Sequence, residues 1–174
     1  EGYGDVEALY VDDDYIYAGR RNAIGYVYNK NDFTVETTLE EPKNLAHRIY
    51  ADDSYIYLAE FENFVYVYNK NNFSLITTLD TQNDYNNDIF IYGNYAYVAG
   101  EDGTIRVYNK DDFTLNKTLS IFHDEYFSDR NIISDKDYIY FALNDFYIYD
   151  KNTLEEVKSF TTSGFRYYQS IDYD

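Results

Sequence analysis

The segment 121–126, with the sequence IFHDEY, combines one imidazole with two carboxylates and holds the densest chemistry in the chain. Such a set could transfer protons or hold a divalent cation. Adjacent residues of a loop point in different directions, however, and His123 with Asp124 does not complete a metal site. We therefore favour a solvated loop with local hydrogen bonds. His47, which precedes Arg48, is the second histidine of the chain. A contact between the imidazoles of His47 and His123 is the weaker alternative.

Two other groups of residues could bind anions or rings. Arg20 and Arg21 form the one dibasic pair of an acidic chain and could hold a carboxylate, sulfate or phosphate. Such a pair more often neutralises neighbouring carboxylates, which is the interpretation that we favour. Arg166 and Tyr167 could stack on a sugar or on a partner's side chain, although aromatic packing between sheets is the favoured use of these rings.

Runs of aspartate at 12–14 and 111–112 suggest calcium binding. Calcium takes about six to eight oxygen ligands from alternate positions of a loop, and contiguous aspartates in tight turns do not supply them. The chain has no cysteine, which excludes disulfides and thiolate metal sites. It also lacks G-x-S-x-G, H-E-x-x-H and glycine-rich phosphate motifs. We expect no cofactor, with calcium as the minor alternative.

The chain is strongly acidic, with a formal net charge of -18 and a sequence pI of about 4.2. Nucleic acids and anionic membranes repel such a surface, and no apolar run approaches the roughly 20 residues that span a bilayer. We therefore expect a protein or carbohydrate partner and no membrane insertion. Sequons at Asn72 and Asn116 are candidates for glycosylation in a secreted or cell-surface protein.

A pentapeptide written four times shows which elements must position these residues. It reads YVYNK at 26–30 and 66–70, RVYNK at 106–110 and YIYDK at 147–151, so successive copies are 40, 40 and 41 residues apart. Each copy sits among four short runs of β-branched and aromatic residues, such as 48–51, 55–59, 64–68 and 75–79. No window of helical length has an apolar stripe at helical spacing, so an all-β fold is predicted.

The strand runs are apolar on both faces, as in FVYVY at 64–68, which predicts sheets that are covered on both sides. Four-stranded antiparallel sheets stacked around an axis meet this demand, and we predict a β-propeller. Its four blades of about 40 residues are expected at 6–45, 46–86, 87–128 and 129–169, with the first strand of a further blade at 170–174. Stacked repeats leave an apolar face at each end. We therefore expect a larger propeller, or one that is closed by partner chains.

The segment 15–39, which contains YIYAG, GYVYNK and FTVETTL in order, resembles a blade of the YVTN/WD40-like and quinoprotein-like propellers. The resemblance extends over nearly the whole chain. It departs from the family in having no tryptophan, hence no WD dipeptide and no tryptophan-docking motif. The tyrosine- and asparagine-rich blades are most similar to microbial, particularly archaeal, cell-surface propellers. The resemblance implies an extracellular or cell-surface protein and leaves the activity open, because the family includes binding scaffolds, surface proteins and dehydrogenases.

The segments in which the four copies differ are predicted to share one face of the propeller, and loops on a rigid scaffold commonly carry function. They join the second strand to the third, or one blade to the next. The candidate ligand-binding residues on this face are Arg20, Arg21, His47, Arg48, His123, Asp124, Arg130, Arg166 and Tyr167. The identical hairpins are interpreted as scaffold.

The predicted function is a non-catalytic module for macromolecular binding or structural assembly outside the cell. One alternative is an enzyme or cofactor-binding propeller with a site on the central axis. An enzyme would need carboxylate, histidine or arginine side chains from several blades to converge on one cavity. The other alternative is a self-associating building block of a ring or filament, which would show a large apolar contact between chains.

Overall fold

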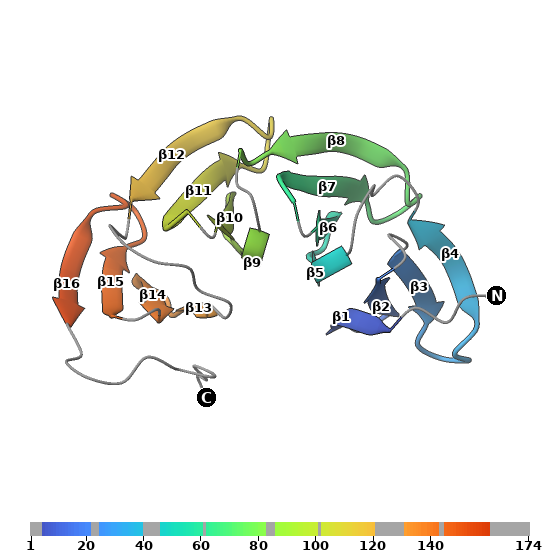
Figure 1. The fold of residues 1–174 in the computed structure, drawn as a ribbon. Helices are drawn as coiled ribbons and strands as arrows, with labels where there is room; N and C mark the ends of the chain where they lie inside the picture. The colour runs from blue at the N-terminus through green and yellow to red at the C-terminus, as the bar shows by residue number, and fades with distance from the viewer. Residues whose placement is uncertain are drawn as a thin grey trace.

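The computed structural model describes residues 5–21, 25–39, 46–60, 62–82, 86–100, 102–120, 131–142 and 145–160. These residues form sixteen strands in four four-stranded antiparallel sheets. The sheets stand side by side around an open arc, as the blades of a β-propeller do (Figure 1). The predictions of an all-β fold and of four four-stranded blades are confirmed.

The strands follow one another in the sequence within every sheet. Blade 1 contains β1 (Val6–Val11), β2 (Tyr15–Arg20), β3 (Gly25–Asn29) and β4 (Val35–Leu39). Blade 2 contains β5 (Ala46–Ala51), β6 (Tyr55–Glu60), β7 (Phe64–Asn69) and β8 (Leu75–Asp80). Blade 3 contains β9 (Asn86–Tyr92), β10 (Tyr95–Gly100), β11 (Thr104–Asn109) and β12 (Leu115–Ser120). Blade 4 contains β13 (Asn131–Ser134), β14 (Tyr138–Ala142), β15 (Phe146–Asp150) and β16 (Glu156–Phe160).

The antiparallel order separates two faces of the arc. The first strand of each blade lies at the inner edge and the fourth lies at the outer edge (Figure 1). The turns between first and second strands, and between third and fourth strands, therefore share one side, which we call the hairpin face. The loops between second and third strands and the connections between blades share the other side, the loop face. The strand predicted at 170–174 lies outside the described residues.

The turn between third and fourth strands is the same in all four blades. In blade 1 the Phe33 N–H donates to the Asn29 carbonyl, and Asn29 Oδ1 accepts the N–H of Asn31. The residue that re-enters the strand has a left-handed backbone, with φ of 60° at Phe33 and similar values at Phe73, Phe113 and Leu154. A bulky side chain in this region costs about 1 to 3 kcal/mol. Packing against the neighbouring blade offsets that cost in blades 2 to 4.

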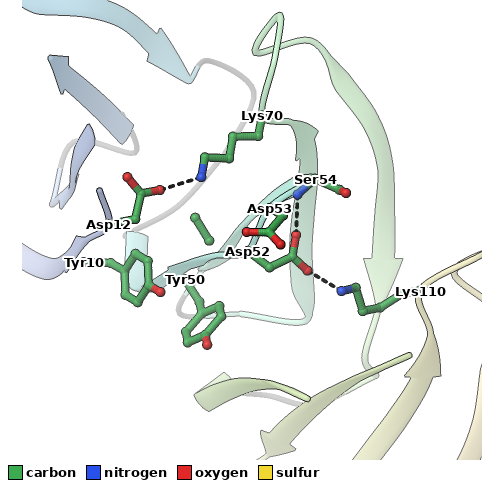
Figure 2. Close-up of a pocket in the computed structure, with 9 residues that line it drawn as sticks. Tyr10, Asp12, Tyr50, Asp52, Asp53, Ser54, Lys70 and Lys110 are labelled. Atoms are coloured by element: carbon green, nitrogen blue, oxygen red, sulfur yellow. Dashed lines mark hydrogen bonds and ion pairs between the residues drawn. The ribbon is translucent and has the colours of Figure 1, made fainter. Parts of the chain in front are cut away.

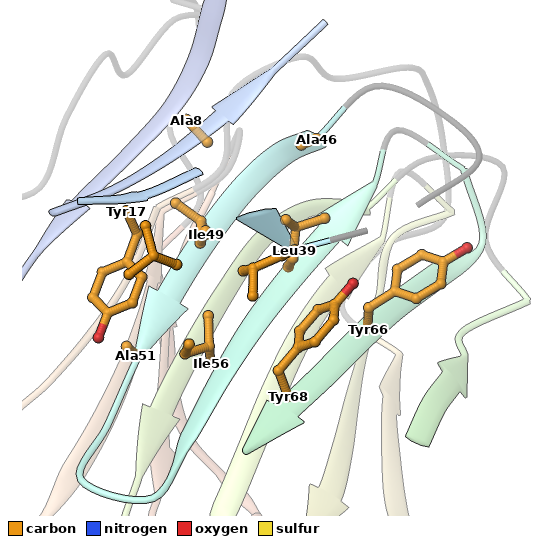
Figure 3. Packing of buried hydrophobic residues seen from close by; sticks show 11 residues of the cluster. Ala8, Tyr17, Leu39, Ala46, Ile49, Ala51, Ile56, Tyr66 and Tyr68 are labelled. Carbon is orange, nitrogen blue, oxygen red and sulfur yellow. The ribbon is translucent and has the colours of Figure 1, made fainter. Parts of the chain in front are cut away.

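The hydrophobic core lies between the blades. Figure 3 shows the cluster between blades 1 and 2, in which Tyr17 and Leu39 face Ile49, Ile56 and Tyr68, all of them buried. Equivalent clusters join blade 2 to blade 3 and blade 3 to blade 4. Blades 2 and 3 therefore each contribute one apolar face to the cluster before them and the other to the cluster after them, which explains why their strand runs are apolar on both faces.

In blades 2 to 4 the second tyrosine of the repeated pentapeptide faces the preceding blade. This tyrosine is buried in all three blades, as Tyr68, Tyr108 and Tyr149. The Tyr108 hydroxyl also donates to the carbonyl of Asp80 in blade 2, at 3.3 Å. The copies in blades 2 to 4 therefore share a contact with the preceding blade through this tyrosine.

Candidate binding site on the hairpin face

The dibasic pair predicted on the loop face is engaged within blade 1. Arg21 Nε lies 2.7 Å from Glu7 Oε1, on the strand beside it. The guanidinium of Arg20 lies 4.6 Å from the centroid of the Tyr26 ring. Arg21 thus has a carboxylate as its partner, and Arg20 has an aromatic ring.

His47 and Arg48 lie on the inner strand β5, near the loop face. Arg48 Nη1 donates to the His47 carbonyl at 3.0 Å, and Arg48 Nε lies 4.0 Å from Asp88 Oδ1 on the next inner strand. Burial raises the pKa of the Asp88 carboxyl to about 6, and the nearby Arg48 charge offsets only part of this shift. This pair joins blades 2 and 3 at the inner edge of the arc.

The remaining loop-face candidates, His123, Asp124, Arg130, Arg166 and Tyr167, lie outside the described residues. The meeting of His47 with His123 therefore stays a prediction.

Both sequon asparagines, Asn72 and Asn116, are exposed. Asn72 Oδ1 accepts the N–H and the hydroxyl of Ser74, at 3.0 and 2.8 Å. Asp112 makes the same two bonds with Thr114 in blade 3. The Asn72 sequon thus also serves the geometry of the turn.

A cavity of about 410 Å³ opens on the hairpin face (Figure 2). Three blades contribute to it, because its walls come from the first hairpins of blades 1 and 2 and from the third-strand exits of blades 2 and 3. Its lining residues are Tyr10, Asp12, Tyr50, Ala51, Asp52, Asp53, Ser54, Lys70 and Lys110.

Two tyrosines form an aromatic pair in this cavity. The ring centroids of Tyr10 and Tyr50 lie 4.6 Å apart, and the rings are tilted by 37°. Burial raises the pKa of both phenols, that of Tyr50 to about 12. Both hydroxyls are therefore neutral at physiological pH and can donate as well as accept hydrogen bonds.

Asp12 connects blade 1 to blade 2. Its Oδ2 lies 2.8 Å from Lys70 Nζ and accepts the Tyr17 hydroxyl at 2.8 Å, while its Oδ1 accepts the N–H groups of Asp14 and Tyr15. Burial alone would raise the pKa of Asp12, but the hydrogen bonds from Lys70, Tyr15, Tyr17 and Asp14 outweigh it and lower the pKa. The carboxylate is held ionised and fixed in orientation.

Asp52 repeats this arrangement one blade further on. Its Oδ1 accepts the N–H groups of Ser54 and Tyr55, both at 2.8 Å, and its Oδ2 lies 2.5 Å from Lys110 Nζ of blade 3. The lysine that ends each copy of the repeated pentapeptide is Lys70, Lys110 or Lys151 in blades 2 to 4. We call each contact between this lysine and the preceding blade an interblade latch. Two latches, Asp12–Lys70 and Asp52–Lys110, border the cavity (Figure 2).

The third latch has a different partner. Blade 3 carries Tyr92 where blades 1 and 2 carry aspartate, and Lys151 Nζ lies 2.9 Å from the centroid of the Tyr92 ring. Lys151 is only 6% exposed, so its ammonium group is desolvated against this ring. Aspartate returns in blade 4, where Asp135 Oδ2 accepts the Tyr140 hydroxyl at 2.7 Å.

The cavity suits binding better than proton transfer. Lys70 and Lys110 are both paired with carboxylates, and the pKa of Asp12 is lowered, which makes it a weak base. Carboxylate oxygens and neutral phenols remain as partners for a polar group with N–H or O–H donors. Within the described ranges, no three His, Cys, Asp or Glu side chains are grouped so that they could hold a metal ion.

Sequence reasoning missed this cavity because identical hairpins were interpreted as scaffold. The signal was a spacing longer than one repeat: Lys70 follows Asp12 by 58 residues, and Lys110 follows Asp52 by the same number. A spacing of one repeat plus part of a second indicates a contact between neighbouring blades.

In the part of the chain that the structure describes, no helix is long and apolar enough to cross a membrane.

Comparison with known proteins supports the fold and leaves the activity open. No protein family profile matches the chain, and no curated protein matches it. Among solved structures, the chain is similar to a computationally designed protein called Ika8, with a TM-score of 0.80 and 14% sequence identity. The match covers 90% of this chain and 49% of that one, so the chain spans about half the length of the designed protein.

Proposed function

We propose that the chain is a non-catalytic β-propeller module that binds a partner protein through the cavity on its hairpin face. The observation that carries this proposal is that the lysines of the cavity are paired with carboxylates, whereas other oxygen atoms of its lining can contact a ligand. The latches hold both lysines against carboxylates. Asp53, Tyr10 and Tyr50 also line the cavity and offer oxygen atoms to a ligand.

The partner has a cationic group. A carboxylate beside two phenols suits the ammonium or guanidinium group of a lysine or arginine side chain, which can stack on the rings and donate to the oxygens. The net charge of -18 favours the same partner, because it attracts basic segments over long distances. The binding is therefore weakened by salt.

The test uses a hexa-arginine peptide and isothermal titration calorimetry at low salt. We expect Asp53→Asn to weaken binding about fivefold or more, because it removes a charge-assisted hydrogen bond. Glu36→Gln is the matched control, since Glu36 is exposed on the outer strand β4, does not line the cavity, and the charge change is the same.

Equal losses in the two variants would mean that the peptide responds to overall charge, and would overturn the role of the cavity. Binding of a neutral oligosaccharide that depends on Tyr50, measured with Tyr50→Phe, would assign the cavity to carbohydrate instead. No binding of either probe would overturn the proposed function.

The proposed location is outside the cell or at its surface. The exposed sequons at Asn72 and Asn116 and the resemblance to cell-surface propellers support it. Mass spectrometry of the native protein before and after glycosidase treatment tests this location, and an unmodified Asn72 and Asn116 would remove the sequons from the argument.

A further inference from the structure

We propose that blade 4 of one copy docks on blade 1 of a second copy, through the same contacts that join consecutive blades within the chain. This inference is independent of the cavity and goes beyond the proposed function. It rests on two complementary surfaces at the ends of the arc, which we call the leading face and the trailing face.

The leading face, on blade 1, consists of Leu9, Val11, Tyr28, Lys30 and Phe33. Apart from Ser134, which stands at the position of Val11 in blade 4, its counterparts in blades 2 to 4 contact the preceding blade. Leu9 is 66% exposed, whereas its counterparts Ile49, Ile89 and Ile132 are buried in the three interblade clusters. Phe33 is 70% exposed, but Phe73 packs on Tyr15 of blade 1 with ring centroids 5.5 Å apart, and Phe113 packs on Tyr55 in the same way.

The trailing face, on blade 4, consists of Asp135, Tyr138, Tyr140, Ile148 and Phe160. Its counterparts in blades 1 to 3 contact the following blade. Phe160 is 47% exposed, whereas its counterparts Leu39, Leu79 and Leu119 are at most 4% exposed. Tyr140 and Ile148 are half-buried, although their counterparts in blade 1, Tyr17 and Val27, are fully buried.

The two faces also hold the two halves of a latch. Lys30 occupies the position of Lys70 and is exposed; its Nζ donates to the Asp12 carbonyl of its own blade, at 2.7 Å. Asp135 occupies the position of Asp12 and makes the same bonds to the two following N–H groups and to a tyrosine hydroxyl. Docking in the interblade geometry brings Lys30 of one copy to Asp135 of the other. It also places Phe33 on Tyr138, as Phe73 is placed on Tyr15.

A second copy fits these faces better than an unrelated partner, because each face already complements the other in shape, apolar character and charge. The four blades curve through an open arc (Figure 1), and a second arc related by a twofold axis brings each leading face against a trailing face. The designed protein of the same fold is about twice as long as the stretch that this chain matches. That is the length that two arcs supply together.

The experiment measures the mass of the chain in solution by sedimentation equilibrium. We expect a species of twice the 20.7 kDa of the chain, or a longer series of copies. Phe33→Asp is expected to weaken the association about 30-fold or more, since it removes a central aromatic anchor and adds a charge. Val157→Asp is the matched control, because Val157 is 53% exposed on the outer strand and belongs to neither face.

A charge reversal distinguishes the proposed contact from nonspecific association. Lys30→Glu and Asp135→Lys are each expected to weaken association, and the double variant is expected to recover most of it because the ion pair is restored with reversed signs. Circular dichroism of each variant confirms that the blades are folded.

A chain that stays monomeric, or an assembly that Phe33→Asp and the single charge variants leave unchanged, would overturn the proposal. So would a native polypeptide whose own further blades cover both faces. Asp53→Asn should leave association intact, so failure of the proposed function and failure of this contact can be told apart.

Discussion

The first and third interblade latches place equivalent lysines, Lys70 and Lys151, against different partners. Lys70 meets a carboxylate that also accepts one hydroxyl and two N–H groups. Lys151 meets the face of Tyr92 and is almost fully buried. The scaffold thus keeps the cation while its partner varies. The difference teaches that the lysine serves blade stacking in general, whereas the aspartates of blades 1 and 2 also shape the cavity.

The largest expected effect comes from removing the carboxylate of the first latch. Asp12→Ala leaves Lys70, the Tyr17 hydroxyl and two N–H groups without their acceptor, so we expect the free energy of unfolding to fall by about 3 kcal/mol. Chemical denaturation measures this loss. Asp135→Ala is the control, and both variants are made in the Phe33→Asp background that separates the copies, because Asp135 then makes the same turn and tyrosine bonds without a lysine partner. A loss as large in the control would show that the latch itself contributes nothing.

Removing the ring of the third latch is expected to have a smaller effect. Tyr92→Ala leaves the buried ammonium of Lys151 without its π partner, which should lower the free energy of unfolding by about 2 kcal/mol. The same denaturation experiment on the double variant Tyr92→Ala, Lys151→Met completes the test. If the second substitution restores no stability, the cation is not the source of the loss.

Converting the third latch into the first kind should change stability little. Tyr92→Asp gives Lys151 a carboxylate in place of a ring, and we expect the free energy of unfolding to stay within about 1 kcal/mol of the starting protein. A loss as large as that of Tyr92→Ala would mean that blade 3 cannot adopt the aspartate arrangement of blades 1 and 2.

The smallest expected effect is a change in pH dependence. Asp12 has a lowered pKa, so its contribution to stability is present at neutral pH and is lost as the pH falls below about 4. The pKa shift of Asp88 has the opposite sign. Its pKa is raised to about 6, so its ionisation lowers stability as the pH rises from about 4 to 6.

Asp88→Asn should therefore flatten the stability profile between pH 4 and pH 7, measured as the thermal unfolding midpoint across that range. An unchanged slope in this range would show that Asp88 ionises in the folded protein as readily as in the unfolded one.

The fold was predictable because it depends on local patterns that the chain repeats. Strands such as Phe64–Asn69 combine β-branched and aromatic residues on both faces, and the turn residues fall at equal intervals. The latches were not predictable from any one repeat, because Asp12 and Lys70 belong to different blades. The raised pKa of Asp88 also depends on burial, which the local sequence does not determine. Phe33 and Phe73 occupy equivalent turns, and only the presence of a neighbour makes one exposed and the other partly buried.

The placement of the core between blades, and not within them, has a consequence for how the protein unfolds. Each hydrophobic cluster among the described residues is shared by two blades. The stability of a blade therefore depends on its neighbours, as in a one-dimensional chain with nearest-neighbour coupling. Among the described residues, blades 2 and 3 have two neighbouring blades each, whereas blades 1 and 4 have one. Amide hydrogens of β2 and β14 should therefore exchange with solvent faster than those of β6 and β10. A second copy docked at the ends would slow the exchange of the terminal blades toward that of the central ones.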